Sequence, residues 1–346
     1  STGAYNTAVG YQALEENTTA SNNTAVGYLA LTDNTTGIYN VAVGSTALAA
    51  NTTGVNNTGV GFRALSANTT GVDNSAFGIQ TLYYNTTGQY NVALGSSALL
   101  NNTTANKNTA VGVNAAGQLT TGHSNAAVGH HAYKNATGSY NVAIGRDALL
   151  NATSNSNVAV GHAALNANTS GVLNTAVGAN ALDANTEGNN NTALGQNSLT
   201  TNTTANNNTG LGYNALAVNS TGTSNVAVGS QALDANTTAN NSVAVGYSAL
   251  TTNTTGSRNT TVGSMSLEQN TTGSYNIAMG YQALENNTTG SSNVSLGYKT
   301  LEANNADNNT AVGFEALKVN TSGAQNVAIG AYALDANTTG PDNTAI

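Results

Sequence analysis

The chain contains no cysteine and no tryptophan, has a single proline, and is charged at only 6% of its 346 positions. Without cysteine, it can form neither a disulfide framework nor a thiolate metal site. About 25% of the residues in an ordinary globular domain are charged. Uncharged polar groups, or sugars attached to them, must therefore supply much of the solubility of this surface.

Basic residues are the scarcer charged class. Seven Lys and Arg stand against 15 Asp and Glu, and the formal net charge is -8. A nucleic-acid interface needs a stripe of basic residues to bind phosphates, so we expect no nucleic-acid partner. Apolar runs also fall short of the roughly 18 residues that a membrane helix requires, so we expect no membrane span.

One unit fills the chain. Residues 6–14 read Asn-Thr-Ala-Val-Gly-Tyr-Gln-Ala-Leu, Asn-Thr-Thr follows at 17–19, and the unit returns every 17 residues, with three shorter steps of 16. A fixed period of this length is typical of a solenoid, so we expect residues 1–346 to form a single repetitive shaft. Both ends fall in mid-repeat, which suggests a segment of a longer chain. The glycine of the unit is present in all twenty complete copies: Gly10, Gly27, Gly44, Gly61, Gly78, Gly95, Gly112, Gly129, Gly145, Gly161, Gly178, Gly195, Gly212, Gly229, Gly246, Gly263, Gly280, Gly297, Gly313 and Gly330.

The start of the unit predicts a strand and a bend. With Asn6 as position one, position two is mostly β-branched, position four is apolar, and a small residue such as Ala8 lies between them. Strand side chains alternate, so positions two and four share one face and the small residue takes the other. We expect the position-four residue to belong to the core and the small face to pack against another layer or another chain. The position-five glycine is expected to bend the backbone.

The rest of the unit predicts a second short strand and a turn. Position nine is Leu in eighteen of twenty copies, with Ala116 and Tyr133 as exceptions, so we expect it in the core. Asn-Thr-Thr-Gly, beginning at position twelve, favours a turn. Together these patterns predict an all-β fold, a parallel β-solenoid (β-roll or β-helix) of about 20 coils with a 17-residue repeat. The alternative is a strand-plus-short-helix coil, as in a leucine-rich repeat, because residues 11–16 include helix formers.

The expected core is thin. Burying a large aliphatic side chain contributes roughly 1.5–3 kcal/mol, whereas ordering a residue costs about 1.5 kcal/mol. Two or three large groups per coil do not by themselves offset the cost of ordering 17 residues. We therefore expect a homo-oligomer, with a trimeric fibre favoured, the small face buried between chains and end-to-end filaments as a further form of self-association. A monomeric solenoid is the alternative.

Position twelve also carries candidate N-glycosylation sites, because Asn-x-Ser/Thr is the acceptor motif. The alternative for this column is a plain turn or an inward ladder of hydrogen-bonded asparagines. The candidate asparagines are Asn17, Asn34, Asn51, Asn68, Asn85, Asn102, Asn135, Asn151, Asn168, Asn202, Asn219, Asn236, Asn253, Asn270, Asn287, Asn320 and Asn337.

Chemistry-bearing residues are scattered. No Ser-His-Asp or paired-carboxylate constellation recurs in one place, so we expect no enzyme, no catalytic residue and no cofactor. We also expect no metal site, with a site near His130 and His131 as the alternative to ordinary surface variation. The stretch from Gly112 to Gly145 is atypical, because it loses the repeated Leu and Asn and gains His123, His130 and His131, which suggests a kink or a specialised patch there. His162 is expected to be ordinary surface variation. A strip of exposed aromatics at position six is the expected contact face for sugars. Its tyrosines are Tyr11, Tyr28, Tyr213, Tyr247, Tyr281 and Tyr298.

The repeated string resembles repeats of phage tail-fibre-like and bacterial surface fibre proteins. It is also similar to the β-roll heads of trimeric autotransporter adhesins, whose repeats carry Ala-Val-Ala-Ile-Gly, as residues 141–145 and 326–330 nearly do. The resemblance implies an extracellular, cell-surface or virion location and a non-enzymatic structural shaft. A receptor-binding or glycan-binding fibre is the alternative function. An ice-binding solenoid is less favoured, because Thr18 and Thr19 are adjacent and would diverge.

Overall fold

The computed structural model describes residues 2–346, so the expectation that Ser1 belongs to the repeat lies outside its range. The chain divides into two compact units, Ser1–Val172 and Leu173–Ile346, and each is described by itself. Strands are the regular elements of both units, and residues 2–346 contain no helix. No element in that range is therefore a long apolar helix of the kind that crosses a membrane. The strand-plus-helix alternative is wrong.

Each coil contributes one short strand. The first unit contains β1 (Thr7–Val9), β2 (Thr24–Val26), β3 (Val41–Val43), β4 (Thr58–Val60), β5 (Ser75–Phe77), β6 (Val92–Leu94), β7 (Thr109–Val111), β8 (Ala126–Val128), β9 (Val142–Ile144) and β10 (Val158–Val160). The second contains β11 (Thr175–Val177), β12 (Thr192–Leu194), β13 (Thr209–Leu211), β14 (Val226–Val228), β15 (Val243–Val245), β16 (Thr260–Val262), β17 (Ile277–Met279), β18 (Val294–Leu296), β19 (Thr310–Val312), β20 (Val327–Ile329) and β21 (Thr344–Ala345).

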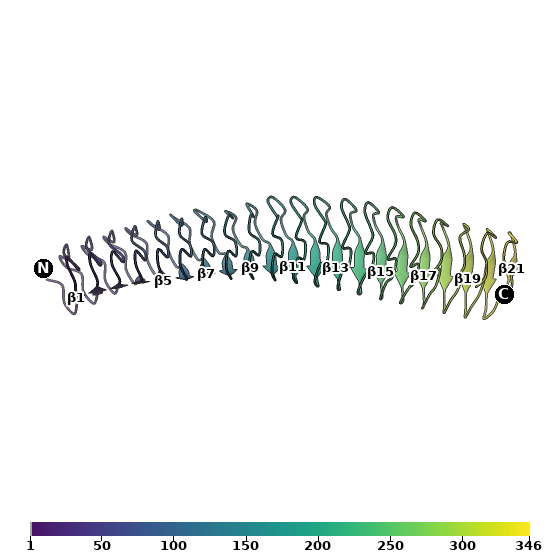
Figure 1. The fold of residues 1–346 in the computed structure, drawn as a ribbon, viewed down its shortest axis with the longest axis horizontal. Helices are drawn as coiled ribbons and strands as arrows, with labels where there is room; N and C mark the ends of the chain where they lie inside the picture. The colour runs from purple at the N-terminus through teal and green to yellow at the C-terminus, as the bar shows by residue number, and fades with distance from the viewer. Residues whose placement is uncertain (1) are drawn as a thin grey trace. The chain divides into compact units, whose positions relative to one another are not determined.

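Strands of successive coils pair in parallel within each unit, and every position pairs with its equivalent. Ala25 of β2 lies opposite Ala42 of β3, for example. The register survives the shorter coils, where Ala126 pairs with Val142 at a separation of 16 residues. Figure 1 shows the strands of each unit side by side, with the turns of each coil looping away from them. The predicted all-β parallel β-solenoid of about 20 coils with a 17-residue repeat is confirmed.

The predicted second strand is absent from the coils, and residues after the glycine form consecutive turns instead. Positions seven and nine have left-handed backbone angles, as in Thr46 (φ 54°) and Leu48 (φ 51°), and this interrupts an extended conformation. Stacking continues through these turns all the same. The Leu48 amide donates to the Ala64 carbonyl at 2.9 Å, and the Thr46 amide donates to the Tyr28 carbonyl at 2.7 Å.

The position-five glycines bend the chain at a conformation that side chains disfavour. All twenty have φ between +128° and +142°. A β-carbon added to Gly44 would also lie 2.4 Å from the Gly61 carbonyl oxygen of the next coil. Both the backbone angle and the close approach of the neighbouring coil therefore require glycine.

The core lies between the strand and the position-nine leucine, so the small face packs against another layer of the chain, and the expectation that position four belongs to the core was wrong. The small residue at position three points inward and is buried, as Ala42 is, whereas the position-four residue Val43 is exposed. The interior has little depth at this point, because a β-carbon added to Gly59 would already lie 3.4 Å from Cγ of Leu48. Small residues fill this space, mostly Ala and Gly, and Ser295 and Thr261 are buried at the same position. The small face therefore packs on the chain's own leucines and leaves nothing for a second chain to bury.

Candidate functional site

Two columns of asparagine complete the interior of the coils. The position-one Asn40 donates from Nδ2 to the Gly54 carbonyl (2.8 Å), and its Oδ1 accepts from the Asn57 amide (2.9 Å). The position-twelve Asn51 donates to the same Gly54 carbonyl (3.0 Å) and to Oδ1 of Asn34 in the preceding coil (2.8 Å). Each turn is thus held from both sides, and amide ladders join successive coils.

Most of the predicted glycosylation sites therefore lie inside the solenoid. A sugar on Nδ2 would replace these hydrogen bonds and needs space that the interior lacks. Sequon occupancy stays a prediction, and the folded coil disfavours it at the buried positions. Asn17 and Asn337, in the end coils, are only partly buried. The fully buried candidates are Asn34, Asn51, Asn68, Asn85, Asn102, Asn168, Asn202, Asn219, Asn236, Asn253, Asn270, Asn287 and Asn320.

Asn135 and Asn151 do not occupy the place that the sequence alignment predicted. Ala136 and Ala152 take the buried position-twelve site in these two coils. Asn135 is exposed and Asn151 is half-buried, so both belong to position eleven. The shortened turn comes after them. Counting from Asn125 and Asn141 at position one gives the same assignment, whereas matching the letter Asn did not.

The atypical stretch fills its interior by exchanging large and small residues. In one coil Ala116 replaces the position-nine Leu while Leu119 takes the place of the position-twelve Asn, and both are buried. In the next coil the buried Tyr133 reaches across, and its hydroxyl accepts from Nδ2 of Asn141 at 2.8 Å. Burial raises the pKa of the Tyr133 phenol. The position-twelve ladder stops where this stretch begins, and Oδ1 of Asn102 is left buried without a partner. The position-one ladder continues, because the Asn125 amide donates to Oδ1 of Asn108 at 3.0 Å.

The outward face of the sheet carries an exposed apolar column at position four. Because the strands are in register, these side chains follow one another from coil to coil, as Phe77 and Leu94 do. A contiguous apolar strip of this kind is typical of an interaction surface. The exposed members are Val9, Val43, Phe77, Leu94, Val128 and Ile144 in the first unit, and Leu194, Leu211, Val262, Met279 and Ile329 in the second.

The aromatic strip predicted at position six exists in parts. In the first unit, Tyr11 and Tyr28 stack with ring centroids 5.4 Å apart. In the second unit, Tyr281 stacks on Tyr298 at 5.6 Å, and Tyr298 stacks on Phe314 at 5.1 Å. Tyr332 meets the edge of Phe314 at 5.3 Å. We call these four residues, 281, 298, 314 and 332, the aromatic ladder. The sequence pattern did not predict its last two members, because residue 314 is a phenylalanine and residue 332 lies at position seven.

A lattice of opposite charges adjoins the aromatic ladder. Lys299 pairs with Glu302 at 2.9 Å, and Lys318 pairs with Glu315 at 2.8 Å and with Glu302 at 3.9 Å. The hydrogen bond to its carboxylate raises the pKa of each lysine, Lys299 through Glu302 and Lys318 through Glu315. Aromatic faces and charges are therefore concentrated on one stretch of the second unit.

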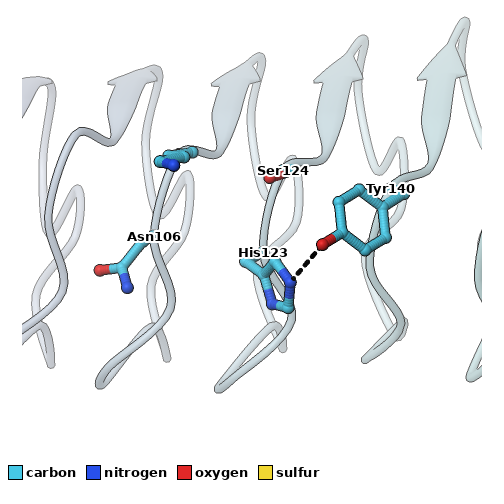
Figure 2. Close-up of a pocket in the computed structure, with 5 residues that line it drawn as sticks. Asn106, His123, Ser124 and Tyr140 are labelled. Atoms are coloured by element: carbon cyan, nitrogen blue, oxygen red, sulfur yellow. Dashed lines mark hydrogen bonds between the residues drawn. The ribbon is translucent and has the colours of Figure 1, made fainter.

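The first unit has an open pocket of about 450 Å³ lined by Asn106, Lys107, His123, Ser124 and Tyr140. Figure 2 shows the imidazole of His123 and the ring of Tyr140 projecting from neighbouring coils, joined through Nε2 and the hydroxyl at 3.0 Å. Nδ1 of His123 lies 3.2 Å from Oγ of Ser139. An aromatic ring surrounded by amide, imidazole and ammonium groups can accept a small polar ligand such as a sugar ring.

A second histidine group lies on the position-six and position-seven turns. The rings of His130 and His131 have centroids 3.7 Å apart, and Nδ1 of His131 lies 3.5 Å from Oδ1 of Asp147 in the next coil. Burial, more than the nearby charge of Lys134, lowers the pKa of His131. Asp147 was missed at the sequence level, although it shares position seven with His131. His162 is exposed and is not part of this group.

The position-thirteen threonines, one of the two columns considered for ice binding, donate hydrogen bonds to the next coil. The position-thirteen hydroxyl of Thr35 donates to the Thr52 carbonyl of the next coil at 3.1 Å. Its hydrogen is therefore directed along the stack rather than to solvent, and this column gives ice binding no support.

Comparison with known proteins adds no family, because no protein-family model matches the chain and no curated protein matches it.

Proposed function

We propose that the chain is the non-enzymatic structural shaft of an extracellular fibre, and that its coils serve as a spacer. The repetition of one interior carries this proposal. Leu, Ala and two asparagine columns recur through both units, and their hydrogen bonds run from coil to coil. Such an interior supports the stacking of many coils. Its repeated residues do not bring catalytic side chains together in a cleft.

The shaft is proposed to assemble as a homotrimer through the position-four column. Exposed Val, Leu, Ile, Phe and Met side chains on a sheet face support burial against identical chains. Each buried large aliphatic would contribute roughly 1.5–3 kcal/mol, which supplements the thin core. The surface expected to be buried thus differs from the inward alanine face that the sequence suggested.

Light scattering after gel filtration tests this proposal directly. The unaltered chain is expected at three times its monomer mass, and Val43→Lys combined with Leu94→Lys is expected to shift it to the monomer. Thr53→Lys, on an exposed turn of the same unit, is the matched control and should leave the mass unchanged. A monomeric native chain, or a mass equally insensitive to both variants, contradicts the proposed assembly.

A glycan-binding fibre is the second candidate, and the aromatic ladder favours it. Tyr298 is stacked between Tyr281 and Phe314, so the ladder presents a row of half-exposed ring edges beside paired charges, an aromatic surface on which sugars pack. Tyr298→Ala is expected to abolish retention on a glycan array, whereas Tyr213→Ala, outside the ladder, should not change it. Retention that is absent from the native chain, or unaffected by Tyr298→Ala, removes this candidate.

A further inference from the structure

We propose that His130, His131 and Asp147 form a binding site for a divalent transition-metal ion such as Zn²⁺. One ligand atom from each of the three residues can be chosen so that all lie within 4.8 Å of one another. Two imidazoles and one carboxylate are donors that Zn²⁺ accepts, with a fourth position left for water or an outside ligand.

The stack of coils brings the ligands together. His131 and Asp147 are both at position seven, and their backbone angles are φ 58° and 56°. The His131 amide donates to the Val113 carbonyl at 3.1 Å, and the Asp147 amide donates to the His130 carbonyl at 3.2 Å. These hydrogen bonds tie the ligand-bearing turns to neighbouring coils, so the backbone is organised before any ion binds.

The ligand spacing fits one ion. Two ligands at about 2.0 Å from a tetrahedral zinc ion lie roughly 3.3 Å apart. Nδ1 of His131 and Oδ1 of Asp147 are separated by 3.5 Å, so this pair needs almost no adjustment. The exposed His130 ring packs on that of His131, with centroids 3.7 Å apart, and one of its nitrogens lies within 4.8 Å of the other two ligand atoms.

The positive charge of Arg146 repels a metal ion at this site, but the guanidinium does not contact the carboxylate oxygen that would bind the ion. Nε of Arg146 lies 3.0 Å from Oδ2 of Asp147, which leaves Oδ1 directed to His131. Removing the guanidinium should therefore strengthen the attraction for a metal ion, which gives the test a variant with the opposite sign.

Titration calorimetry of the full, untagged chain with ZnCl₂ tests the proposal. We expect one ion per chain, and an affinity about 10- to 100-fold lower in His131→Asn and in Asp147→Asn, by analogy with the losses seen when partners of metal ligands are removed. Asparagine tolerates the left-handed backbone, and Asn114 already occupies position seven in a neighbouring coil, so folding should be kept. Circular dichroism checks this point.

Two further variants make the outcome decisive. His162→Gln, an exposed histidine outside the group, should bind Zn²⁺ like the native chain, and Arg146→Gln should bind it more tightly. Absence of Zn²⁺ binding by the native chain overturns the proposal. So does equal affinity in a folded His130→Asn, His131→Asn, Asp147→Asn triple variant.

Discussion

Glycine occupies two recurrent positions of the coil for different reasons. Gly44, at position five, has φ +137°, in a region that side chains rarely adopt. Gly37, at position fifteen, has no such backbone angle, and the equivalent position holds Ala20 and Ala105 in other coils. Position five is therefore limited by conformation, and position fifteen only by local space.

Gly44→Ala is expected to destabilise the first unit more than Gly37→Ala does. The backbone angle alone should cost about 1–3 kcal/mol at Gly44. An added β-carbon would meet a carbonyl of the next coil at both positions, Gly61 at 2.4 Å and Gly54 at 2.3 Å, so the predicted difference rests on the backbone angle. Urea unfolding measures both variants, and equal losses would contradict the conformational explanation.

Asn51 tests the buried amide ladder. Its side chain makes three hydrogen bonds, to Asn34 (2.8 Å), to the Gly54 carbonyl (3.0 Å) and from Asn68 (2.8 Å). Asn51→Ala leaves the Asn34 acceptor unpaired, at a cost of about 1–3 kcal/mol.

Asn51→Asp should cost more at pH 7, because a buried carboxylate would then face two carbonyl oxygens. Burial should raise the pKa of that carboxyl, so its penalty should shrink as the pH falls. Asn22→Asp makes the same change on an exposed residue and should have little effect. Urea midpoints at pH 7 and pH 4 measure this, and equal effects at Asn51 and Asn22 would count against the ladder.

Glu268 gives a pH dependence of known sign. Burial first, and the charge of Glu285 second, raise the pKa of Glu268 above its usual 4.5. The folded state therefore holds the proton more tightly, and the second unit loses stability as the pH rises from about 4 through the raised value. Glu268→Gln should stabilise the chain at pH 7 and have little effect below pH 4. Thermal unfolding against pH measures this, with the exposed Glu16→Gln as control; a difference that grows on acidification would contradict the assignment.

At the scale of the element, alternation predicted the strand but not which of its faces lies inside. A period of two shows that positions two and four share a face, and Val or Ile at both favoured the interior. The depth between strand and leucine decides otherwise, because Leu48 already contacts the position of a single β-carbon at Gly59. The distance between the strand and the leucine follows from the left-handed backbone angles at positions seven and nine. The residue types at these positions did not predict those angles.

A one-residue insertion should be tolerated in the turn and not in the strand. Glycine inserted after Thr137 restores a 17-residue coil and leaves the pairing of Ala126 with Val142 intact. Glycine inserted after Ala143, within β9, turns the larger Ile144 toward an interior that the strands otherwise fill with small residues. Thermal unfolding should show a small shift for the first chain and a large loss for the second. Equal losses would contradict the register described here.

For the molecule as a whole, the period predicted the architecture and the in-register pairing, because a repeat must stack equivalent positions. The candidate sites were less accessible. His130 and His131 are adjacent in sequence, but Asp147 reaches them only through the stack. Asn135 was misplaced, because it was matched to the Asn of other coils by residue type, although counting from Asn125 puts Ala136 at position twelve.

X-ray diffraction from oriented material tests the central claim, that each coil lies on the one before through a parallel ladder, most directly. A strong reflection at a spacing of about 4.8 Å along the stacking direction is expected from strands paired in this way. A 1.5 Å axial repeat, typical of helices, or a 4.8 Å reflection absent from that direction would contradict it.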